Sequence, residues 1–172
     1  MASGIQYRNA RPDDAVKLSV LFKVVYIQTY GVEGVSDEFA NFIAKQFSVE
    51  RISNLIQNQP EALIVAQYQG NLVGVCEIAF AKPSPVGNIT APELNKLYIL
   101  EWFCGKGIGS RLLEFAEKTA RDQGETQMWL WVLESNHRAI EFYKRQDYVT
   151  IGNASFQMET NKYENKVMAK TL

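Results

Sequence analysis

The sequence predicts a mixed α/β fold, in which strands that pair locally at first are later joined through crossover helices. Two observations predict it. Short apolar runs of strand-like composition alternate with longer segments whose apolar residues recur at helical spacing, and no internal repeat interrupts the alternation. The 172 residues, 47% of them hydrophobic, fit a single domain over residues 1–172 with a sizeable core.

In the first half of the chain, a strand over residues 5–8 precedes three helices and a β-hairpin. The helix over residues 15–30 carries an apolar stripe that we expect in the core, formed by Val16, Val20, Val24 and Ile27. Ser36 and Ser48 are placed to cap the next two helices. The turn signal at Gln69-Gly70-Asn71 then joins strands over residues 62–66 and 72–78.

The second half begins, after a polar loop, with a strand over residues 94–100 and an amphipathic helix from Ile108 that Gly124 is placed to end. The strand over residues 127–133 is apolar on both faces, which predicts a central position in the sheet. Asn136 can cap a short helix that runs through residues 143–145. The last strands are expected over residues 148–151, 155–158 and 166–170.

Composition excludes several classes of protein. With 18 basic and 19 acidic residues the net charge is −1, so a general nucleic-acid binder is not expected. Cys76 and Cys104 lack the spacing of a disulfide framework or a zinc site, which favours a reducing compartment and no metal. Met1 to Gly4 lead directly into a strand, and no apolar run approaches the roughly 18 residues of a membrane span. We therefore expect a soluble, cytoplasmic protein without a membrane partner.

A glycine-rich loop between a strand and an amphipathic helix is the first candidate site. In Gly105-Lys106-Gly107-Ile108-Gly109-Ser110, backbone N–H groups and the helix N-terminus together form an anion site. The Walker pattern is absent, and Ser110 stands where a dinucleotide fingerprint has its last glycine. A Rossmann-like nucleotide-binding module is therefore an alternative, but too few βα units follow to complete it.

The helix after the next strand adds a second candidate. Asn136, Ile140 and Tyr143 fall at positions i, i+4 and i+7, so they share one helical face. An Asn amide can hold amide-like groups of a ligand, and a Tyr hydroxyl can donate a proton to a leaving thiolate. A helix cap and a half-buried core Tyr are the structural alternatives for the same two residues.

Taken together, these motifs resemble the GNAT N-acetyltransferases, and most closely the PaiA-type polyamine (spermidine/spermine) N-acetyltransferases. The resemblance covers most of the chain and rests on Leu97-Tyr98-Ile99, on the run from Gly105 to Ser110, on Asn136 and on Phe142-Tyr143. It implies a single domain with a mixed, mostly antiparallel sheet flanked by helices. It also implies acetyl transfer from acetyl-CoA by direct attack of a neutral amine in a ternary complex, without a metal.

Carried over position by position, the resemblance assigns roles to individual residues. Backbone groups of Leu97, Tyr98 and Ile99 would meet the pantetheine and the acetyl carbonyl. The pyrophosphate would be cradled by Gly105, Lys106, Gly107, Ile108, Gly109 and Ser110. Asn136 would hold the pantetheine arm, and Tyr143 would be the general acid for the coenzyme A thiolate.

The sequence departs from the family pattern at three positions. Cys104 replaces the usual Gln or Arg at the start of the loop, which predicts weaker coenzyme binding. Asp147 replaces the Gly that commonly follows the Tyr helix. Asn95 cannot ionise where relatives often carry a carboxylate base, so Glu93 and Glu77 are the substitute candidates, with solvated strand residues as the alternative.

The expected acceptor is a small-molecule amine, and a cationic polyamine would be attracted by carboxylates around the acceptor cleft. The segment over residues 26–38, with Tyr30, Glu33, Asp37 and Glu38, is where we expect them, although a solvated acidic face would carry the same residues. Acetylation of a protein N-terminus or lysine is an alternative, as is a non-catalytic coenzyme A sensor. Dimerisation is common in the resembling family, so a homodimer is a further expectation that no segment specifies.

Overall fold

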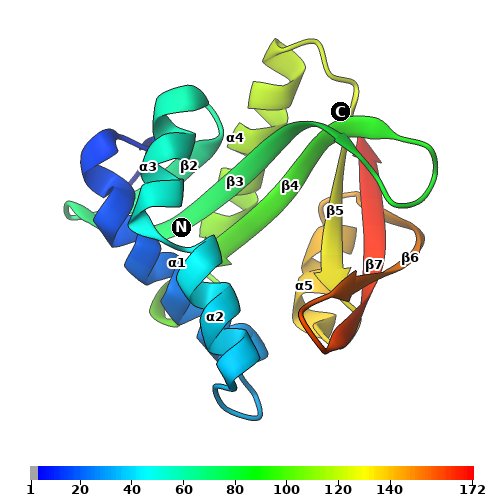
Figure 1. The fold of residues 1–172 in the computed structure, drawn as a ribbon. Helices are drawn as coiled ribbons and strands as arrows, with labels where there is room; N and C mark the ends of the chain where they lie inside the picture. Colours follow the sequence, from blue (N-terminus) through cyan, green and yellow to red (C-terminus); the bar gives the residue numbers. More distant parts are fainter. Residues whose placement is uncertain (1–3) are drawn as a thin grey trace. The chain divides into compact units, whose positions relative to one another are not determined.

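The computed structural model describes residues 4–172 and shows an α/β fold with a seven-stranded, mostly antiparallel sheet flanked by helices, as predicted (Figure 1). The helices are α1 (Ala15–Tyr30), α2 (Asp37–Gln46), α3 (Val49–Asn58), α4 (Ile108–Asp122) and α5 (His137–Lys144), with short 3-10 turns at Pro12–Asp14 and Glu101–Phe103. The expectation that no leader is present rests partly on residues 1–3, which lie outside the described residues.

The strands are β1 (Ile5–Asn9), β2 (Leu63–Tyr68), β3 (Asn71–Pro83), β4 (Thr90–Ile99), β5 (Gln127–Leu133), β6 (Val149–Gln157) and β7 (Lys162–Thr171). Their order in the sheet is β1-β2-β3-β4-β5-β7-β6. The β4–β5 pair is parallel, with Glu93 opposite Trp129. The β1–β2, β2–β3, β5–β7 and β6–β7 pairs are antiparallel.

The chain forms two compact units. The first unit comprises the residues up to Glu77 together with Lys96–Phe115, and the second comprises Ile78–Asn95 and Ala116–Leu172. Strands β3 and β4 and helix α4 each contribute residues to both units.

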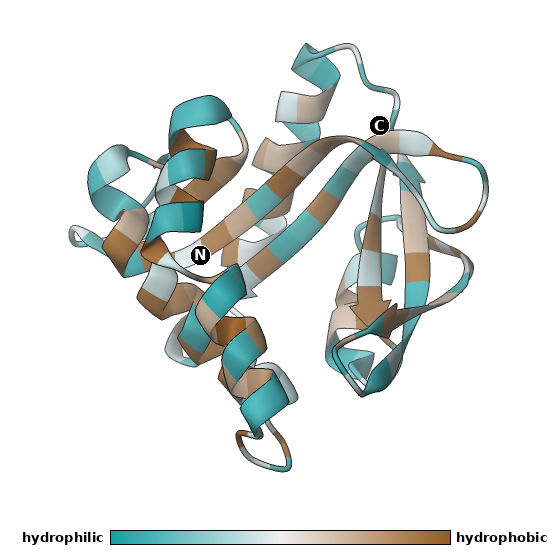
Figure 2. Ribbon diagram, in the orientation of Figure 1, coloured by the Kyte–Doolittle hydropathy of each residue, from teal (hydrophilic) through white to brown (hydrophobic). Residues whose placement is uncertain are grey.

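Local capping explains where α2 and α3 begin. The Ser36 hydroxyl accepts the Phe39 N–H, and the Ser48 hydroxyl accepts the Arg51 N–H, at 3.2 Å in each case. Both caps were predicted from the sequence and are confirmed. Hydrophobic and hydrophilic bands alternate along both helices (Figure 2), and the apolar face of α2 and the following turn bury Phe39, Ile43 and Phe47.

The core face of α1 is not the predicted one. The stripe of Val16, Val20, Val24 and Ile27 is exposed, with exposed fractions of 63%, 57%, 37% and 39%. The buried face instead carries Leu18, Leu21, Phe22 and Val25. Both faces are apolar, so periodicity alone could not distinguish them, and aromatic packing of Phe22 on Phe47 at 5.4 Å favours the second.

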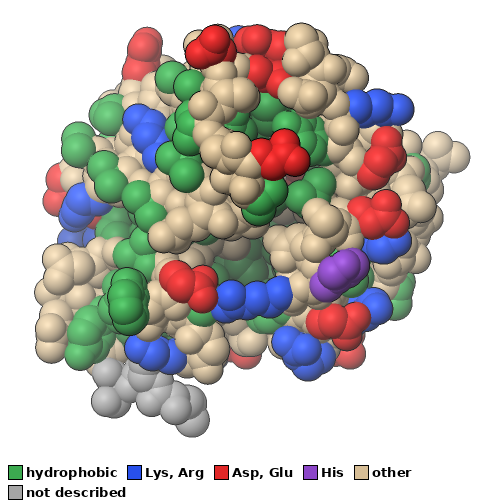
Figure 3. All heavy atoms as spheres, turned by 90° about the horizontal axis from the view of Figure 1, so that it is seen from below, with side chains coloured by type: hydrophobic (Ala, Val, Ile, Leu, Met, Phe, Trp, Pro, Cys, Tyr) green, Lys and Arg blue, Asp and Glu red, His purple; other side chains and the backbone are tan. Residues whose placement is uncertain are grey.

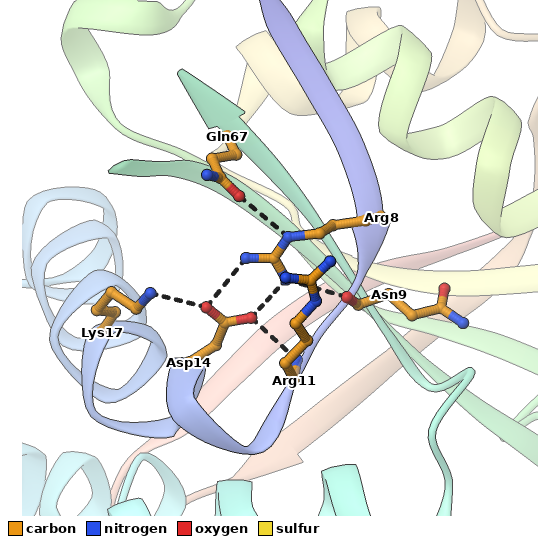
Figure 4. Close-up of polar contacts among 6 residues, drawn as sticks. All are labelled: Arg8, Asn9, Arg11, Asp14, Lys17 and Gln67. Carbon is orange, nitrogen blue, oxygen red and sulfur yellow. Dashed lines mark hydrogen bonds and ion pairs between the residues drawn. The ribbon is translucent and has the colours of Figure 1, made fainter. Parts of the chain in front are cut away.

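A buried carboxylate links β1 to the start of α1 (Figure 4). The Arg8 guanidinium donates to both oxygens of Asp14, at 2.6 and 3.1 Å, and Lys17 Nζ lies 2.9 Å from Asp14 Oδ1. The Arg11 N–H adds a hydrogen bond of 2.9 Å. Burial opposes the charged form, but these partners outweigh it and lower the pKa of Asp14. Asp14 is therefore charged, and its hydrogen bonds and ion pairs connect β1 to the start of α1.

In the second unit, β5 is a buried strand, as its apolar pattern predicts. The Trp129 indole N–H is within 3.1 Å of the carbonyls of both Lys82 and Ala91. Two of the predicted final strands, over residues 148–151 and 155–158, are wrong as separate elements. They form the single strand β6, whose register shifts between Thr150 and Gly152. The irregularity lets one strand bend where the sequence suggested a break.

Candidate functional site

The glycine loop lies between the 3-10 turn at Glu101–Phe103 and helix α4, in the first unit. Gly105 and Gly107 have φ values of 72° and 80°, a conformation that residues with a Cβ adopt at a cost. A Cβ at either position would meet no atom of the described residues within 4 Å. The first helical bond runs from the Arg111 N–H to the Gly107 carbonyl. The loop thus presents an open backbone face at a helix N-terminus, which suits a pyrophosphate.

The loop carries one basic side chain, that of Lys106. Lys106 is exposed, and its Nζ lies 4.9 Å from the centroid of the Phe103 ring, which in turn packs on Tyr68 at 5.7 Å. Cys104 turns the other way, because its Sγ lies 3.8 Å from the Ile99 carbonyl and 3.7 Å from that of Leu100. Lys106 and the backbone amides therefore supply the positive potential of the loop, and the Cys104 side chain does not.

The end of β4 carries the residues expected to meet the pantetheine. Leu97, Tyr98 and Ile99 are half-buried, and the Tyr98 ring packs edge-on against Phe22 at 5.9 Å. On β3, a Cβ at Gly74 would lie 3.2 Å from the Tyr98 carbonyl oxygen. A side chain at this position would require its neighbours to shift by a few tenths of an ångström, so glycine suits the close approach of β3 to the end of β4.

Glu77, one of the two predicted bases, is 2% exposed and held between two cations. Its Oε1 accepts from Arg51 Nη2 at 2.6 Å, and its Oε2 lies 3.2 Å from Lys96 Nζ. Burial favours the neutral acid, but Lys96 and Arg51 outweigh it and lower the pKa of Glu77 below its ordinary value of 4.5. A carboxylate stabilised in this way is a weak proton acceptor.

Sequence reasoning missed Arg51 and Lys96, the partners of Glu77. The available signal was a lone carboxylate, Glu77, inside an otherwise apolar strand run, because a buried charge requires partners. Which cations would supply them depends on the packing of α3 and β4, which the pattern does not specify.

Glu93, the other predicted base, lies on β4 in the second unit and is half-buried. Alternation along the strand places Glu93 and Asn95 on one face and Lys96 and Tyr98 on the other. Glu93 is opposite Trp129 in the parallel β4–β5 register. Strand position thus separates Glu93 from the face that carries the Lys96 ammonium group.

Helix α5 brings the other predicted residues together, also within the second unit. Asn136 caps the helix, with its Oδ1 accepting the Ala139 N–H at 3.1 Å. Because the cap uses the oxygen, the amide nitrogen keeps its donors for another partner. Tyr143 is 8% exposed and packs edge-on against Phe142 at 5.2 Å and Tyr148 at 5.8 Å. Asn136 is thus the cap that the structural alternative expected, whereas Tyr143 is buried rather than half-buried.

Asp147 and Tyr148 lie in the turn after helix α5 and at its end. Asp147 has a φ of 67°, so the turn keeps the left-handed conformation that the family's usual Gly would adopt. The hydroxyl of Tyr148 is buried and has no hydrogen-bond partner among the described residues. Burial raises the pKa of Tyr148, so this hydroxyl stays protonated.

The segment over residues 26–38, where acceptor contacts are expected, combines aromatic rings with carboxylates. The Tyr26 ring lies 4.6 Å from that of Tyr30 and 5.4 Å from that of Phe39. Glu33 and Asp37 are exposed in the loop and at the start of α2, and Glu38 is half-buried. Burial raises the pKa of Tyr30, which keeps its ring system neutral.

Charge is mixed on the face that Figure 3 shows, where acidic and basic side chains are interspersed. Among residues 4–172, no cluster of His, Cys, Asp and Glu is arranged to hold a metal ion, and none of the helices has the length and apolarity to cross a bilayer.

Comparison with known proteins identifies the class. The model of the acetyltransferase (GNAT) family matches residues 32–148, more than half of the chain. An uncharacterized N-acetyltransferase of Chlorobaculum tepidum is 32% identical over 149 residues, which cover 87% of this chain and 78% of the relative.

Solved structures share the fold. The PaiA N-acetyltransferase from Thermoplasma acidophilum, in complex with coenzyme A, has a TM-score of 0.74 at 22% identity and covers 98% of this chain and 99% of its own. A ribosomal-protein-alanine N-acetyltransferase from Brucella melitensis has a TM-score of 0.73 at 20% identity, covering 97% and 99%. These structures share the fold, and the family model and the 32% identical relative show that the protein is an acyltransferase. The chain belongs to the GNAT family, as an acetyl-CoA-dependent N-acetyltransferase of that type.

Proposed function

We propose that the protein transfers the acetyl group of acetyl-CoA to a primary amine of a small polyamine of the spermidine or spermine kind. The observation that carries the choice of acceptor is the pairing of Tyr26 and Tyr30 at 4.6 Å in the same segment of the chain as the exposed residues Glu33 and Asp37. Aromatic faces and carboxylates both attract an alkylammonium group. A second, charged amine of the acceptor would bind here while the reacting amine is neutral.

In the proposed reaction, one side chain donates a proton and another accepts one. The neutral amine attacks the thioester carbonyl, a C–N bond forms, and the C–S bond breaks with the electron pair leaving on sulfur. Tyr143 donates its hydroxyl proton to that thiolate. Glu93 accepts the proton that the acetylated nitrogen loses, through water, and we prefer it to Glu77 because Arg51 and Lys96 already stabilise the Glu77 carboxylate.

Coenzyme binding uses groups of a different kind. The pyrophosphate fits the open backbone face of Gly105 and Gly107, with Lys106 adding a positive charge. The amide nitrogen of Asn136 is available to the carbonyls of the pantetheine arm, since the helix cap uses the amide oxygen.

The test measures release of the coenzyme A thiol with acetyl-CoA and a panel of acceptors: spermidine, spermine, a monoamine and a short peptide. We expect the two polyamines to give the highest kcat/KM. Replacing both carboxylates, Glu33→Gln with Asp37→Asn, should raise the KM for spermidine severalfold. The KM for the monoamine should change less. Glu50→Gln, an exposed carboxylate on α3 outside this segment, is the matched control.

Other outcomes would decide between the alternatives. Preference for the peptide would replace the polyamine proposal with acetylation of a protein N-terminus or lysine. Tight binding of acetyl-CoA without thiol release for any acceptor would favour a non-catalytic coenzyme A sensor. An unchanged KM for spermidine in the double variant would remove the role of Glu33 and Asp37.

A further inference from the structure

The most exposed large hydrophobic side chain described is next to the glycine loop. Trp102 is 89% exposed, in the middle of the 3-10 turn Glu101–Phe103. Its neighbour Phe103 is half-buried, packs on Tyr68 and carries the Lys106 ammonium over its ring. Single exposed apolar side chains are common on protein surfaces, so the position of Trp102 beside the glycine loop, rather than its exposure alone, makes it a candidate ligand contact.

We propose that the Trp102 indole is a stacking platform for the adenine of coenzyme A. This inference rests on the proposed function and adds a residue to its coenzyme site. Every nucleobase presents a π-face, and stacking on an aromatic side chain requires no pattern of hydrogen bonds. A Trp that is solvated on both faces can offer one of them to a base without rearranging the fold.

The position of Trp102 matches the chemistry of the coenzyme. Two residues lie between it and Gly105, so the two Cα atoms are at most about 11 Å apart. The turn is tightened further by hydrogen bonds from the Phe103 N–H to the Leu100 carbonyl and from the Cys104 N–H to the Glu101 carbonyl. In coenzyme A a single ribose joins the pyrophosphate to the adenine. A pyrophosphate on the loop therefore holds the base within reach of the turn.

The platform also accounts for how the loop can function with Cys104. The Cys104 side chain turns back to the end of β4 and adds no charge to the anion site. Lys106, placed over the Phe103 ring, supplies one cation. Stacking on Trp102 would contribute affinity through the nucleoside part of the coenzyme, independently of charge on the phosphates.

The experiment compares two ligands by titration calorimetry: coenzyme A, and 4′-phosphopantetheine, which lacks the adenosine 3′,5′-bisphosphate part and so retains one phosphate but no adenine. Trp102→Ala should weaken coenzyme A binding about tenfold (about 1.4 kcal/mol), and should change the affinity for 4′-phosphopantetheine by no more than about twofold. Trp102→Phe should lose less affinity for coenzyme A, because a smaller ring remains. Val16→Ala, which alters another exposed apolar side chain in the same unit and outside the acceptor segment, is the matched control and should change neither affinity.

A second measurement uses the fluorescence of the indole itself. Adenosine 3′,5′-bisphosphate should quench the tryptophan emission of the wild-type protein, and Trp102→Phe should abolish the quenching, because Trp129 and Trp131 lie on β5. Unchanged coenzyme A affinity in Trp102→Ala would overturn the inference and leave the proposed function intact. Equal weakening of both ligands would overturn it as well, and would indicate a distorted loop. A wild-type protein that does not bind coenzyme A would refute the proposed function itself.

Discussion

In the proposed function, the glycine loop of the first unit and helix α5 of the second would contact ligands in opposite ways. The loop presents backbone at Gly105 and Gly107, where positive φ angles and open space depend on the absence of a side chain. Helix α5 presents particular atoms, the Asn136 amide and the Tyr143 hydroxyl, on a face that also buries Ile140. Binding through backbone should tolerate most changes of side-chain chemistry but not added bulk. Chemistry through side-chain atoms should respond to the loss of a single atom.

The largest effect should come from Tyr143→Phe, which removes one oxygen from α5. We expect kcat to fall at least about hundredfold, because general acid catalysis commonly contributes that much. The dissociation constant for acetyl-CoA should stay within about twofold, since the hydroxyl acts mainly in the transition state. Steady-state kinetics and calorimetry measure the two quantities.

The neighbouring ring provides the control for this variant. Tyr148→Phe also removes a hydroxyl from the same aromatic pair, one that is buried without a hydrogen-bond partner among residues 4–172. It should leave kcat close to the wild-type value. Wild-type turnover in Tyr143→Phe would refute Tyr143 as the general acid. It would also remove the contrast between a loop that binds through its backbone and a helix that acts through a side-chain atom.

The next effect should come from Gly107→Val, which tests the backbone side of the comparison. A residue with a Cβ at a φ of 80° costs about 1–2 kcal/mol, and its side chain would enter the open space expected for the phosphates. Acetyl-CoA binding should weaken about tenfold or more, while kcat at saturating acetyl-CoA is retained.

A matched control separates strain from ligand contact. Gly124, after α4, has a φ of 84° and no other described atom within 4 Å of its Cβ position, so Gly124→Val imposes the same strain away from the loop. It should lower the melting temperature without weakening acetyl-CoA binding. Equal affinities in the Gly107→Val variant and the wild type would place the phosphates elsewhere.

The sequence was sufficient where structure depends on local chemistry. The caps by Ser36, Ser48 and Asn136 were predictable because the hydroxyl or amide oxygen and the N–H it accepts are three residues apart. The glycine loop was recognisable for the same reason, since its φ angles and its position before α4 are encoded within a few residues.

Features that depend on contacts between distant segments were not predictable. On α1 both helix faces are apolar, and the choice of the Phe22 face over the Val20 face follows from packing against Phe47. The two carboxylates considered as bases look alike in sequence. The cations that hold the Glu77 carboxylate, Arg51 and Lys96, come from distant segments and could not be identified from the sequence.

A smaller effect should follow from changes at Asn136, where cap and ligand contact use different atoms of one amide. Asn136→Ala loses both and should destabilise the protein by about 1 kcal/mol. Asn136→Ser keeps a capping oxygen but loses the amide donors. We therefore expect near wild-type thermal stability for Ser, with acetyl-CoA binding weakened about fivefold, or about 1 kcal/mol, in both variants.

Differential scanning calorimetry and ligand titration measure the two roles separately. If Asn136→Ser restores affinity together with stability, the residue is a helix cap and nothing more, and α5 contributes only Tyr143 to the reaction. Weakened binding in a fully stable Ser variant would instead support a direct contact between the amide and the pantetheine arm.

The smallest effect should come from Cys104, at the start of the loop. Because the Cys104 Sγ faces the carbonyls of Ile99 and Leu100, Cys104→Ala should leave acetyl-CoA binding unchanged. Cys104→Arg places a cation beside the phosphates and should strengthen binding about two- to threefold, a gain typical of a solvent-exposed ion pair. The gain should shrink at high salt, because screening reduces such interactions. Titrations of acetyl-CoA at two salt concentrations measure this gain. A loss of affinity in Cys104→Ala would show that the thiol supports the loop, and would contradict binding through the loop backbone alone.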